Sequence, residues 1–371
     1  MTRNDMDRFW ADDERAQEDN CFSAAAPQMA LGIRMSDECV FSELQEEGEP
    51  WGITPRARRI DLNRRYNDIA ERTVGIRLLP EEYPPEDAAF PPCKRIGEVF
   101  GGVYSYEHGS EWLSSPIDTP ETLSARLDAV EKLNLRDFLL PENWDAEKRR
   151  IYETYGMRPA QQRHIRGPIT LMCSIYGSEN FIFLAMDEPE LAERFSSLVA
   201  KITLDIAELF DEEAGYTKEN APHGFAFSDD NCCLMTPSMY ERLGLPVLQA
   251  AFSRFAPDEG DSRFQHSDSA MAHILPLLGR TRLTGVNFGP TVTVDQIRAH
   301  LPGARIEGCL SPIDFMRNDK TAILAQLKRD AQMAREYGRG VRFTTAGSIN
   351  DGSLLSSMAY IMEGIAQYAR Y

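Results

Sequence analysis

Residues 263–290 read RFQHSDSAMAHILPLLGRTRLTGVNFGP, and this stretch decides the fold. A short run over 263–265 is followed by a polar loop that begins at His266. A helical pattern over 270–278 comes next, and a second apolar run follows over 283–288. This order of strand, polar loop, helix and strand is typical of a βαβ unit with parallel strands.

The same pattern continues on both sides of this stretch. The apolar runs that we expect to be strands are 168–173, 224–227, 263–265, 283–288, 305–310 and 341–345. The expected helices are 188–213, 237–254, 270–278, 293–301, 319–337 and 353–370. Six consecutive β-then-α units predict a parallel sheet with right-handed crossovers.

Two further units in the irregular first half would make eight, so we predict an α/β fold of the (β/α)8 TIM-barrel type. An open doubly wound sheet would give the same alternation. Its usual G-x-G-x-x-G fingerprint after a first strand is absent, and so is the Walker A pattern.

The first half of the chain has weaker patterns. Helices are expected over 5–19 and 56–72, and a third after Thr119, which is a natural N-cap followed by Pro120. Five prolines make 80–92 a loop or an extended segment. We expect one barrel domain over 1–371, with an N-terminal extension of roughly 1–90 lying on it.

The charge of the chain argues against several classes of protein. Forty Lys and Arg residues stand against 58 Asp and Glu, which gives a net charge of −18. Half of this excess lies in 1–50, where 13 acidic residues face 4 basic ones. A chain this acidic repels phosphate backbones and anionic lipids, so neither nucleic acid nor a membrane surface is an expected partner.

Composition also indicates a cytoplasmic protein. No run of 18 apolar residues is present, and the first twenty residues are too polar for a secretory signal. Seven cysteines without a C-x-x-C pair fit reduced thiols better than a disulfide framework.

In a (β/α)8 barrel, the site lies at the carboxyl ends of the strands. Asp229 and Asp230 follow the run 224–227, where one of them would face the barrel mouth because side chains alternate along a strand. Such a carboxylate can act as a general base, bind a cation or anchor a basic substrate. The alternative is a structural cap on a helix or turn.

His266 and Asp268 lie two residues apart at another strand end, so both can point the same way. They could bind a divalent ion, or the carboxylate could orient a general-base imidazole. Alternatively, Asp268 caps the following helix and His266 fills the wall of the site. Cys309, in a Gly-Cys-Leu-Ser-Pro turn, is either a thiolate ligand or nucleophile, or a small buried hydrophobe.

Further polar residues at the strand ends are candidates for holding a substrate. They are Tyr176, Asn231, Asn287, Thr345 and Ser348. We count Tyr176 with the catalytic candidates and the other four with the substrate-binding ones. Four other histidines, at 164, 223, 273 and 300, lie beside turns or within helices, where a structural role is the simpler interpretation.

Several of these motifs resemble the uroporphyrinogen decarboxylase superfamily. They are Gly-Pro-Ile-Thr-Leu and Asp-Glu-Pro-Glu-Leu within 167–213, Phe-Ser-Asp-Asp at 227–230, Met-Thr-Pro-Ser-Met at 235–239, the segment 263–271, Gly-Cys-Leu-Ser-Pro at 308–312 and Phe-Thr-Thr-Ala-Gly-Ser-Ile-Asn at 343–350. The resemblance covers about 165–371, and it implies a (β/α)8 barrel.

The superfamily includes two chemistries. Its decarboxylases bind a tetrapyrrole through an N-terminal Arg-Gln-Ala-Gly-Arg segment, which is absent here. Its methyltransferases hold zinc with a His-x-Cys pair and a later Cys. His266 matches the histidine, whereas Asp268 stands at the first cysteine and Ser348 near the second. Cys309 could complete a mixed set with His266 and Asp268 for zinc or another divalent ion.

The resemblance therefore implies an enzyme that transfers a methyl or other one-carbon group, with or without a corrinoid protein as partner. One alternative is a decarboxylase of a tetrapyrrole or a smaller carboxylic acid. Another is a barrel that binds a small molecule without catalysis. The expected partners are a small-molecule substrate and, for a homodimer, a second copy of the chain.

Overall fold

The computed structural model describes the chain except residues 34, 49, 51–53, 108–109 and 350. It divides into two compact units. Unit 1 comprises Met1–Tyr83, His266–Leu275 and Arg282–Tyr371, and unit 2 comprises Pro84–Gln265 and Pro276–Thr281. Each unit has its own strands and its own covering helices.

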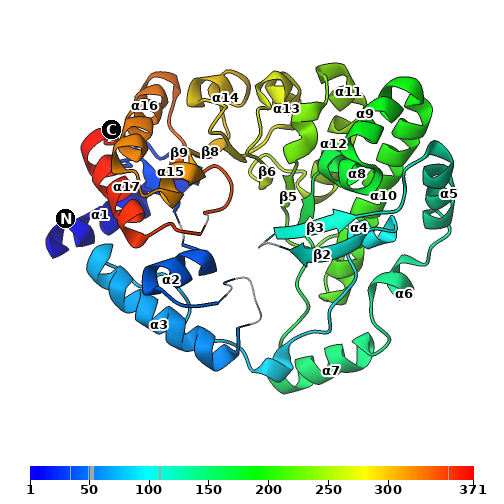
Figure 1. Cartoon of the computed structure of the whole chain (residues 1–371), viewed down its shortest axis with the longest axis horizontal. Helices are drawn as coiled ribbons and strands as arrows, with labels where there is room; N and C mark the ends of the chain where they lie inside the picture. The colour runs from blue at the N-terminus through cyan, green and yellow to red at the C-terminus, as the bar shows by residue number, and fades with distance from the viewer. Residues whose placement is uncertain (34, 49, 51–53, 108–109, 350) are drawn as a thin grey trace. The chain divides into compact units, whose positions relative to one another are not determined.

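Unit 1 contains four parallel strands in the order β1-β9-β8-β7. They are β1 (Ala30–Leu31), β7 (Gly285–Phe288), β8 (Arg305–Leu310) and β9 (Val341–Thr345). Its longer helices are α1 (Arg3–Ala16), α2 (Asp37–Leu44), α3 (Arg56–Thr73), α14 (Val294–His300), α16 (Lys320–Tyr337) and α17 (Leu355–Tyr368). The short α15 (Pro312–Met316) follows β8, and α16 packs against both α14 and α17 (Figure 1).

Unit 2 contains the parallel pair β4 (His164–Arg166) and β5 (Phe225–Ser228), and a separate antiparallel hairpin of β2 (Val103–Glu107) and β3 (Ser110–Ser114). Its helices include α4 (Ile96–Val99), α5 (Pro120–Val130), α6 (Leu135–Leu139), α7 (Trp144–Tyr155), α8 (Pro168–Tyr176), α9 (Ser178–Asp187), α10 (Pro189–Glu213), α11 (Pro237–Leu243) and α12 (Leu245–Phe255). The long α10 packs against α9 and α12 (Figure 1).

Strand β6 (Arg263–Ser267) runs from unit 2 into unit 1, because the division falls between Gln265 and His266. The seven parallel strands have the order β1-β9-β8-β7-β6-β5-β4. The α/β class is therefore confirmed. Closure into an eight-stranded barrel stays a prediction, since the described strands form one sheet with β1 and β4 at its ends.

The core of unit 2 shows why β5 forms where it does. Phe225 and Phe227 are buried, while Ala226 and Ser228 between and after them are half-buried, which is the alternation of a strand with one apolar face. The Phe225 ring stacks on Phe255 of α12. The two buried phenylalanines hold β5 against α12, and Ser228 lies on the opposite face of the strand.

One predicted strand is wrong. Residues 168–173 lie in α8, and the strand of that unit is β4, a few residues earlier. Every residue from Pro168 to Cys173 is buried, so neither a strand period nor a helix period shows in the sequence. Pro168 at the first helical position and Gly167 before it favour the helix.

Most of the other expected elements are present, with shifted ends. The helix predicted over 237–254 is divided at Gly244 into α11 and α12. The helix predicted over 270–278 is a 3-10 turn at Ala272–Ile274 followed by the short α13 (Leu275–Leu278). The capped helix after Thr119 is confirmed as α5. Its start is a capping box, in which the Thr119 side chain accepts the Thr122 N–H and the Thr122 side chain accepts the Thr119 N–H.

The predicted N-terminal extension 1–90 contributes a strand as well as helices, because β1 pairs with β9 in unit 1. Within the described part of the chain, no single helix is long and apolar enough to cross a membrane. Only α8 and α9 together pass that test, as a pair bent by 103°.

Candidate functional site

The predicted site residues divide between the two units. Unit 1 contains His266, Asp268, Asn287, Cys309, Thr345 and Ser348, and unit 2 contains Tyr176, Asp229, Asp230 and Asn231.

Among the candidates of unit 1, Asn287 on β7 makes the central contacts through its buried side-chain amide. Its Oδ1 lies 2.7 Å from Nδ1 of His266 and accepts the N–H of Gly347 at 2.9 Å. Its Nδ2 donates to the carbonyl oxygens of Glu307, at 2.8 Å, and of Thr345, at 3.0 Å. Asn287 thus joins β6, β7, β8 and the loop after β9 at the carboxyl ends of these strands.

These contacts decide which nitrogen of His266 carries its proton. Two carbonyl acceptors hold the NH2 group of Asn287, so its oxygen must face His266 and the Gly347 N–H. Because an amide oxygen only accepts, Nδ1 of His266 donates to it. The lone pair of the neutral ring is then on Nε2, as in a metal-binding or general-base histidine.

Asp268 lies beside His266, on the loop after β6. One ligand atom of each side chain lies within 4.8 Å of the other. A Cβ added at Gly347 would lie 2.6 Å from Oδ2 of Asp268, and Gly347 has φ +79°, which L side chains rarely adopt. The absence of a side chain at Gly347 therefore leaves the room that the Asp268 carboxylate occupies.

His266 and Asp268 provide some of the ligands that a divalent cation needs, but not all of them. One imidazole nitrogen and one carboxylate oxygen are ligands that zinc and harder divalent ions accept. A catalytic zinc ion usually takes three protein ligands, and unit 1 supplies two among its described residues. Any further ligand would have to be water, a substrate atom or another side chain.

The structure does not bring Cys309 to this pair. Within the described residues, Cys309 belongs to no group of His, Cys, Asp and Glu whose ligand atoms approach within 4.8 Å. Its side chain is 2% exposed, and burial raises the pKa of its thiol well above the usual value. The thiol is thus protonated and packed as a small hydrophobic group, which was one of the two interpretations of the sequence.

The two remaining candidates of unit 1 flank Gly347. Thr345 is buried, and its Oγ1 donates to the carbonyl oxygen of Gly347 at 3.0 Å, so it supports the loop that contacts Asn287. Ser348 is exposed on the same loop. Substrate binding by either residue stays a prediction.

In unit 2, Asp229 is completely buried and holds the start of α8. Its Oδ1 accepts the backbone N–H of Thr170 at 2.8 Å, in the first turn of that helix. A Cβ at Gly167 would lie 2.2 Å from Cβ of Asp229, so only glycine allows this approach. Burial outweighs the hydrogen bonds from Thr170 and raises the pKa of Asp229 to about 7. The position is that of a helix cap.

The other three candidates of unit 2, Asp230, Asn231 and Tyr176, have different surroundings. Asp230 is half-buried and lines a cavity. Asn231 receives its support from Thr170, whose Oγ1 accepts the Asn231 N–H at 2.9 Å, and its Nδ2 donates to Ser178 Oγ at 3.3 Å. Tyr176 is buried at the end of α8 and does not line that cavity. Of the four candidates in unit 2, Asp230 is therefore the one that lines the cavity.

This cavity has a volume of about 640 Å³ and lies entirely within unit 2. Part of its wall is apolar and aromatic, and part comes from the exposed face of β4 and β5. His164 and Arg166 are on that face of β4, and Ser228 is on that face of β5, directly beside Arg166 in the register. Nε2 of His164 lies 2.9 Å from Oγ of Ser228.

Sequence reasoning missed both His164 and Arg166. We assigned His164 a structural role, and placing the strand over 168–173 moved the expected strand end away from Arg166. The pattern His-Ile-Arg, polar-apolar-polar, was the available signal, but three residues are too few to establish a period of two.

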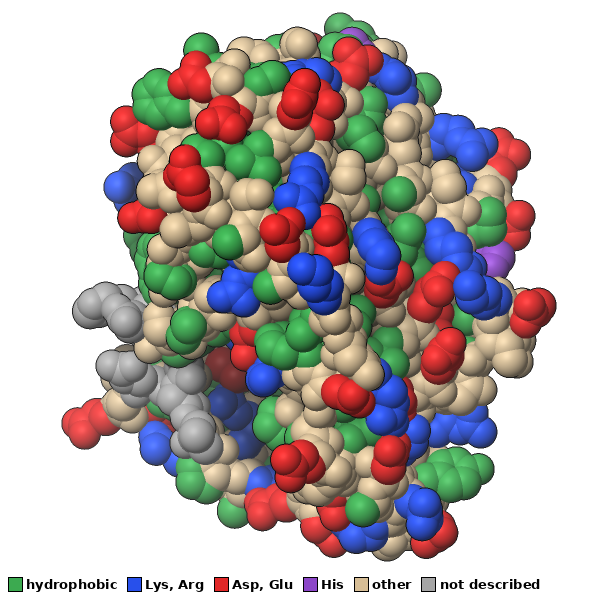
Figure 2. Space-filling view, turned by 90° about the vertical axis from the view of Figure 1, so that its right-hand side faces the viewer, with side chains coloured by type: hydrophobic (Ala, Val, Ile, Leu, Met, Phe, Trp, Pro, Cys, Tyr) green, Lys and Arg blue, Asp and Glu red, His purple; other side chains and the backbone are tan. Residues whose placement is uncertain are grey.

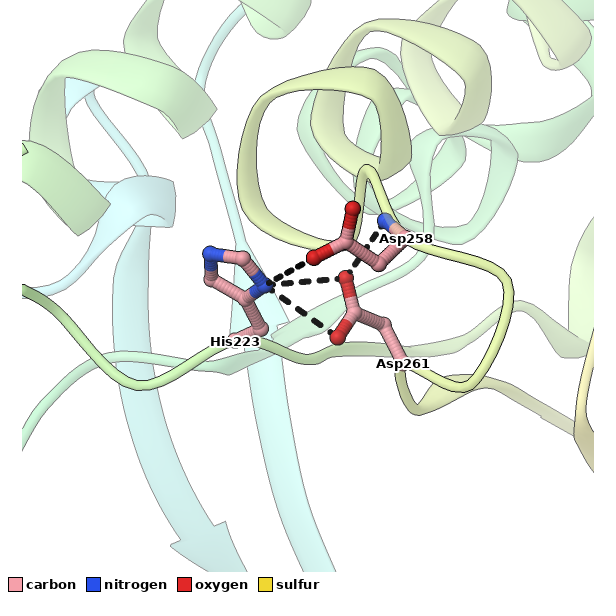
Figure 3. Close-up of side chains that lie close together, drawn as sticks. All are labelled: His223, Asp258 and Asp261. Carbon is pink, nitrogen blue, oxygen red and sulfur yellow. Dashed lines mark hydrogen bonds and ion pairs between the residues drawn. The ribbon is translucent and has the colours of Figure 1, made fainter. Parts of the chain in front are cut away.

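A second group that the sequence did not indicate lies before β5 and β6 (Figure 3). Nδ1 of His223 is 3.0 Å from Oδ2 of Asp261 and 3.5 Å from Oδ2 of Asp258. These ligand atoms could hold a cation. His223 and Asp258 are exposed, however, and ordinary surface contacts between a histidine and two carboxylates explain the arrangement without a cation.

The surface of the face drawn in Figure 2 shows acidic and basic side chains interspersed. Unit 2 contains surface ion pairs of Arg194 with Asp128 and Glu131, and of Arg242 with Glu193. Mixed charge of this kind is ordinary for a solvated surface.

No family model and no curated protein matches the chain. Among solved structures, the chain is similar to a methyltransferase from Methanosarcina mazei, with a TM-score of 0.55 over 90% of this chain and 92% of that one. The two sequences are 13% identical, so the likeness shows a shared fold. Membership of the uroporphyrinogen decarboxylase superfamily stays a prediction from the motifs.

Proposed function

We propose that this protein is a group-transfer enzyme, a methyltransferase, that uses His266 in its reaction. The observation that carries the proposal is the hydrogen bond from Nδ1 of His266 to Asn287, which leaves the lone pair on Nε2 with Asp268 nearby. The fold shared with a methyltransferase and the strand-end motifs support the same function.

His266 can serve this chemistry as a base. A methyl acceptor such as a thiol must lose a proton before or as it attacks the methyl carbon, and Nε2 of His266 can take that proton. The new bond joins the acceptor atom to the methyl carbon as the bond from that carbon to the donor breaks. Asn287 holds the ring so that Nε2 does not exchange roles with Nδ1.

Alternatively, a divalent ion such as zinc would be held by the same Nε2 of His266 and by a carboxylate oxygen of Asp268, and His266 would then not act as the base. When bound, it would lower the pKa of an acceptor thiol. We propose a corrinoid protein as the methyl donor, following the resemblance in the sequence.

The test measures metal content and methyl transfer together. Purified protein is incubated with methylcobalamin and 2-mercaptoethanol, and loss of the methylcobalamin absorbance is recorded, with bound metal measured in parallel. We expect turnover by the wild-type protein and a loss of about 100-fold or more for His266→Ala. His300→Ala, at the end of α14, is the matched control and should keep full activity.

Each outcome of this test has a meaning. Metal in the wild-type protein and none in His266→Ala would support metal assistance, whereas no metal in either would exclude it. Equal turnover by the wild-type protein and His266→Ala would contradict the role of His266.

A decarboxylase of a tetrapyrrole or smaller acid is the second candidate, because Arg166 lines the cavity of unit 2 and could neutralise a carboxylate. A barrel that only binds a small molecule is the third. Mass spectrometry of ligands that co-purify separates these functions, since a corrinoid or folate favours transfer and a porphyrin favours decarboxylation.

A further inference from the structure

The cavity of unit 2 has the size and the walls of a small-molecule site. Its volume of about 640 Å³ falls within the range of ligand-binding pockets. Trp144 and Phe210 line it together with Phe90, Ile96 and Ile206. These side chains give part of the cavity a nonpolar wall.

The charged groups around this cavity are unlike the rest of the chain. The protein has a net charge of −18, yet three cations, Lys94, Arg95 and Arg166, line the cavity against two carboxylates, Glu111 and Asp230. Arg95 is engaged by Glu111 at 2.7 Å and stacks on Tyr104. Lys94 is exposed, and its Nζ lies 4.2 Å from the centre of the Phe138 ring, so Arg166 is the cation left to face the cavity.

Arg166 is the decisive residue. It is half-buried, and among the described residues no carboxylate lies within ion-pair distance of it. Its Nη1 donates a hydrogen bond to Oγ of Ser174 at 2.9 Å, and Ser174 in turn donates to the carbonyl oxygen of Thr170. This holds the guanidinium in place and leaves further N–H donors for another acceptor.

Three other arginines of the same unit form ion pairs with carboxylates, as we expect in an acidic protein. Arg163 pairs with Asp211, Arg194 with Asp128, and Arg254 with Glu208. A partly desolvated guanidinium without such a partner is costly unless an anion completes its hydrogen bonds.

We infer that the cavity of unit 2 binds an organic anion, with its carboxylate or phosphate oxygens on Arg166 and its apolar body against Trp144 and Phe210. Ser228, beside Arg166 in the register, and His164 offer further hydrogen bonds to the same anionic group. This inference concerns binding alone and does not depend on methyl transfer.

The experiment uses the full chain and 8-anilinonaphthalene-1-sulfonate, a fluorescent aromatic anion. We expect saturable binding to one site. Arg166→Gln should weaken it about tenfold or more, because a charge-assisted hydrogen bond is lost, and Arg166→Lys should lie between. Arg194→Gln, which makes the same change on the surface of unit 2, should bind as the wild-type protein does.

Competition identifies the anionic group. Indole-3-acetate and phenyl phosphate should displace the probe, and the stronger competitor separates a carboxylate from a phosphate ligand. Indole-3-acetamide, which keeps the ring and lacks the charge, should displace it at least about tenfold less well. Thermal unfolding of each variant confirms that it is folded.

Three results would overturn the inference. They are the absence of saturable binding to the wild-type protein, equal affinity of folded Arg166→Gln, and displacement by the amide as good as by the acid. Because no turnover is measured, failure of this binding test leaves the methyltransferase proposal to its own test.

Discussion

Nδ1 of His266 lies 2.7 Å from Oδ1 of Asn287, at the carboxyl ends of neighbouring strands β6 and β7. Since the amide nitrogen of Asn287 is held by two backbone carbonyls, its oxygen can only face the imidazole. The role of His266 therefore depends on a residue that need not touch the substrate.

Asn287→Ala should allow the neutral ring of His266 to adopt both tautomers. In the wild-type protein the neutral form of the ring should show the nitrogen chemical shifts of protonation on Nδ1, and in the variant it should show a mixture of both tautomers. The variant also leaves the carbonyl oxygens of Glu307 and Thr345 without their donor, which should reduce the free energy of unfolding by about 1–3 kcal/mol. Nitrogen-15 NMR of labelled histidine and urea unfolding measure the two effects.

Asn287→Asp is a useful comparison for this prediction. Its oxygens can still accept the Nδ1 proton of His266, but it has no N–H to donate to Glu307 and Thr345. The tautomer should be kept while stability falls. If Asn287→Ala kept a single Nδ1-protonated ring, the proposed orientation of His266 would be incorrect.

Asp268→Cys should tighten zinc binding at His266. A thiolate is a softer and stronger ligand for zinc than a carboxylate, and the change creates the His-x-Cys spacing of the zinc-dependent relatives that the sequence resembles. Affinity is measured by competition with a chromophoric chelator. The gain should disappear in the double variant with His266→Ala, and a gain that survived there would place the metal elsewhere.

The residues of unit 1 could be predicted because they lie at the ends of strands whose positions the sequence indicated. His266, Asp268 and Asn287 each come directly after or within a clear apolar run, and the structure brings them together. Cys309 lies within such a run, inside β8, and its side chain is buried in the core. Sequence patterns give the position of a strand end and leave the direction of the next side chain open.

The residues of unit 2 were harder to predict because β4 has only three residues. The apolar run after it belongs to a buried helix, so the strand end was placed too late and Arg166 was missed. Asp229 was correctly expected at a strand end. Its role as a cap on α8 depends on a helix that the sequence pattern did not reveal.

Gly347→Ala should disturb Asp268 as well as the backbone. The residue has φ +79°, and its new Cβ would lie 2.6 Å from Oδ2 of Asp268. The backbone strain alone costs about 1–2 kcal/mol. We expect a larger loss in urea unfolding than this and weaker zinc binding, because the carboxylate must move away from its place beside His266.

Gly156→Ala is the matched control. Gly156 ends α7 with φ +68°, and an added Cβ there meets nothing within 4 Å. It should therefore show the backbone cost without any change in zinc affinity. Equal effects of the two substitutions on stability and on zinc binding would mean that Gly347 does not make room for Asp268.

Asp229 should make the stability of the protein fall as the pH rises. Its pKa is about 7 in the folded protein, because burial penalises the charged carboxylate, against 3.8 in the unfolded chain. The folded state thus binds a proton more tightly than the unfolded state. This contribution is complete below about pH 4 and is lost as the pH rises through 7.

Asp229→Asn stays neutral at every pH and keeps an oxygen for the Thr170 N–H. Its stability relative to the wild-type protein should therefore increase between pH 4 and 8, by on the order of 4 kcal/mol at most. Urea unfolding at pH 4.5, 6 and 8 measures the difference. Asp330 on α16 is also buried with a pKa raised to about 7, so Asp330→Asn should show the same trend. A difference between Asp229→Asn and the wild-type protein that did not change with pH would show that Asp229 is charged in the folded protein.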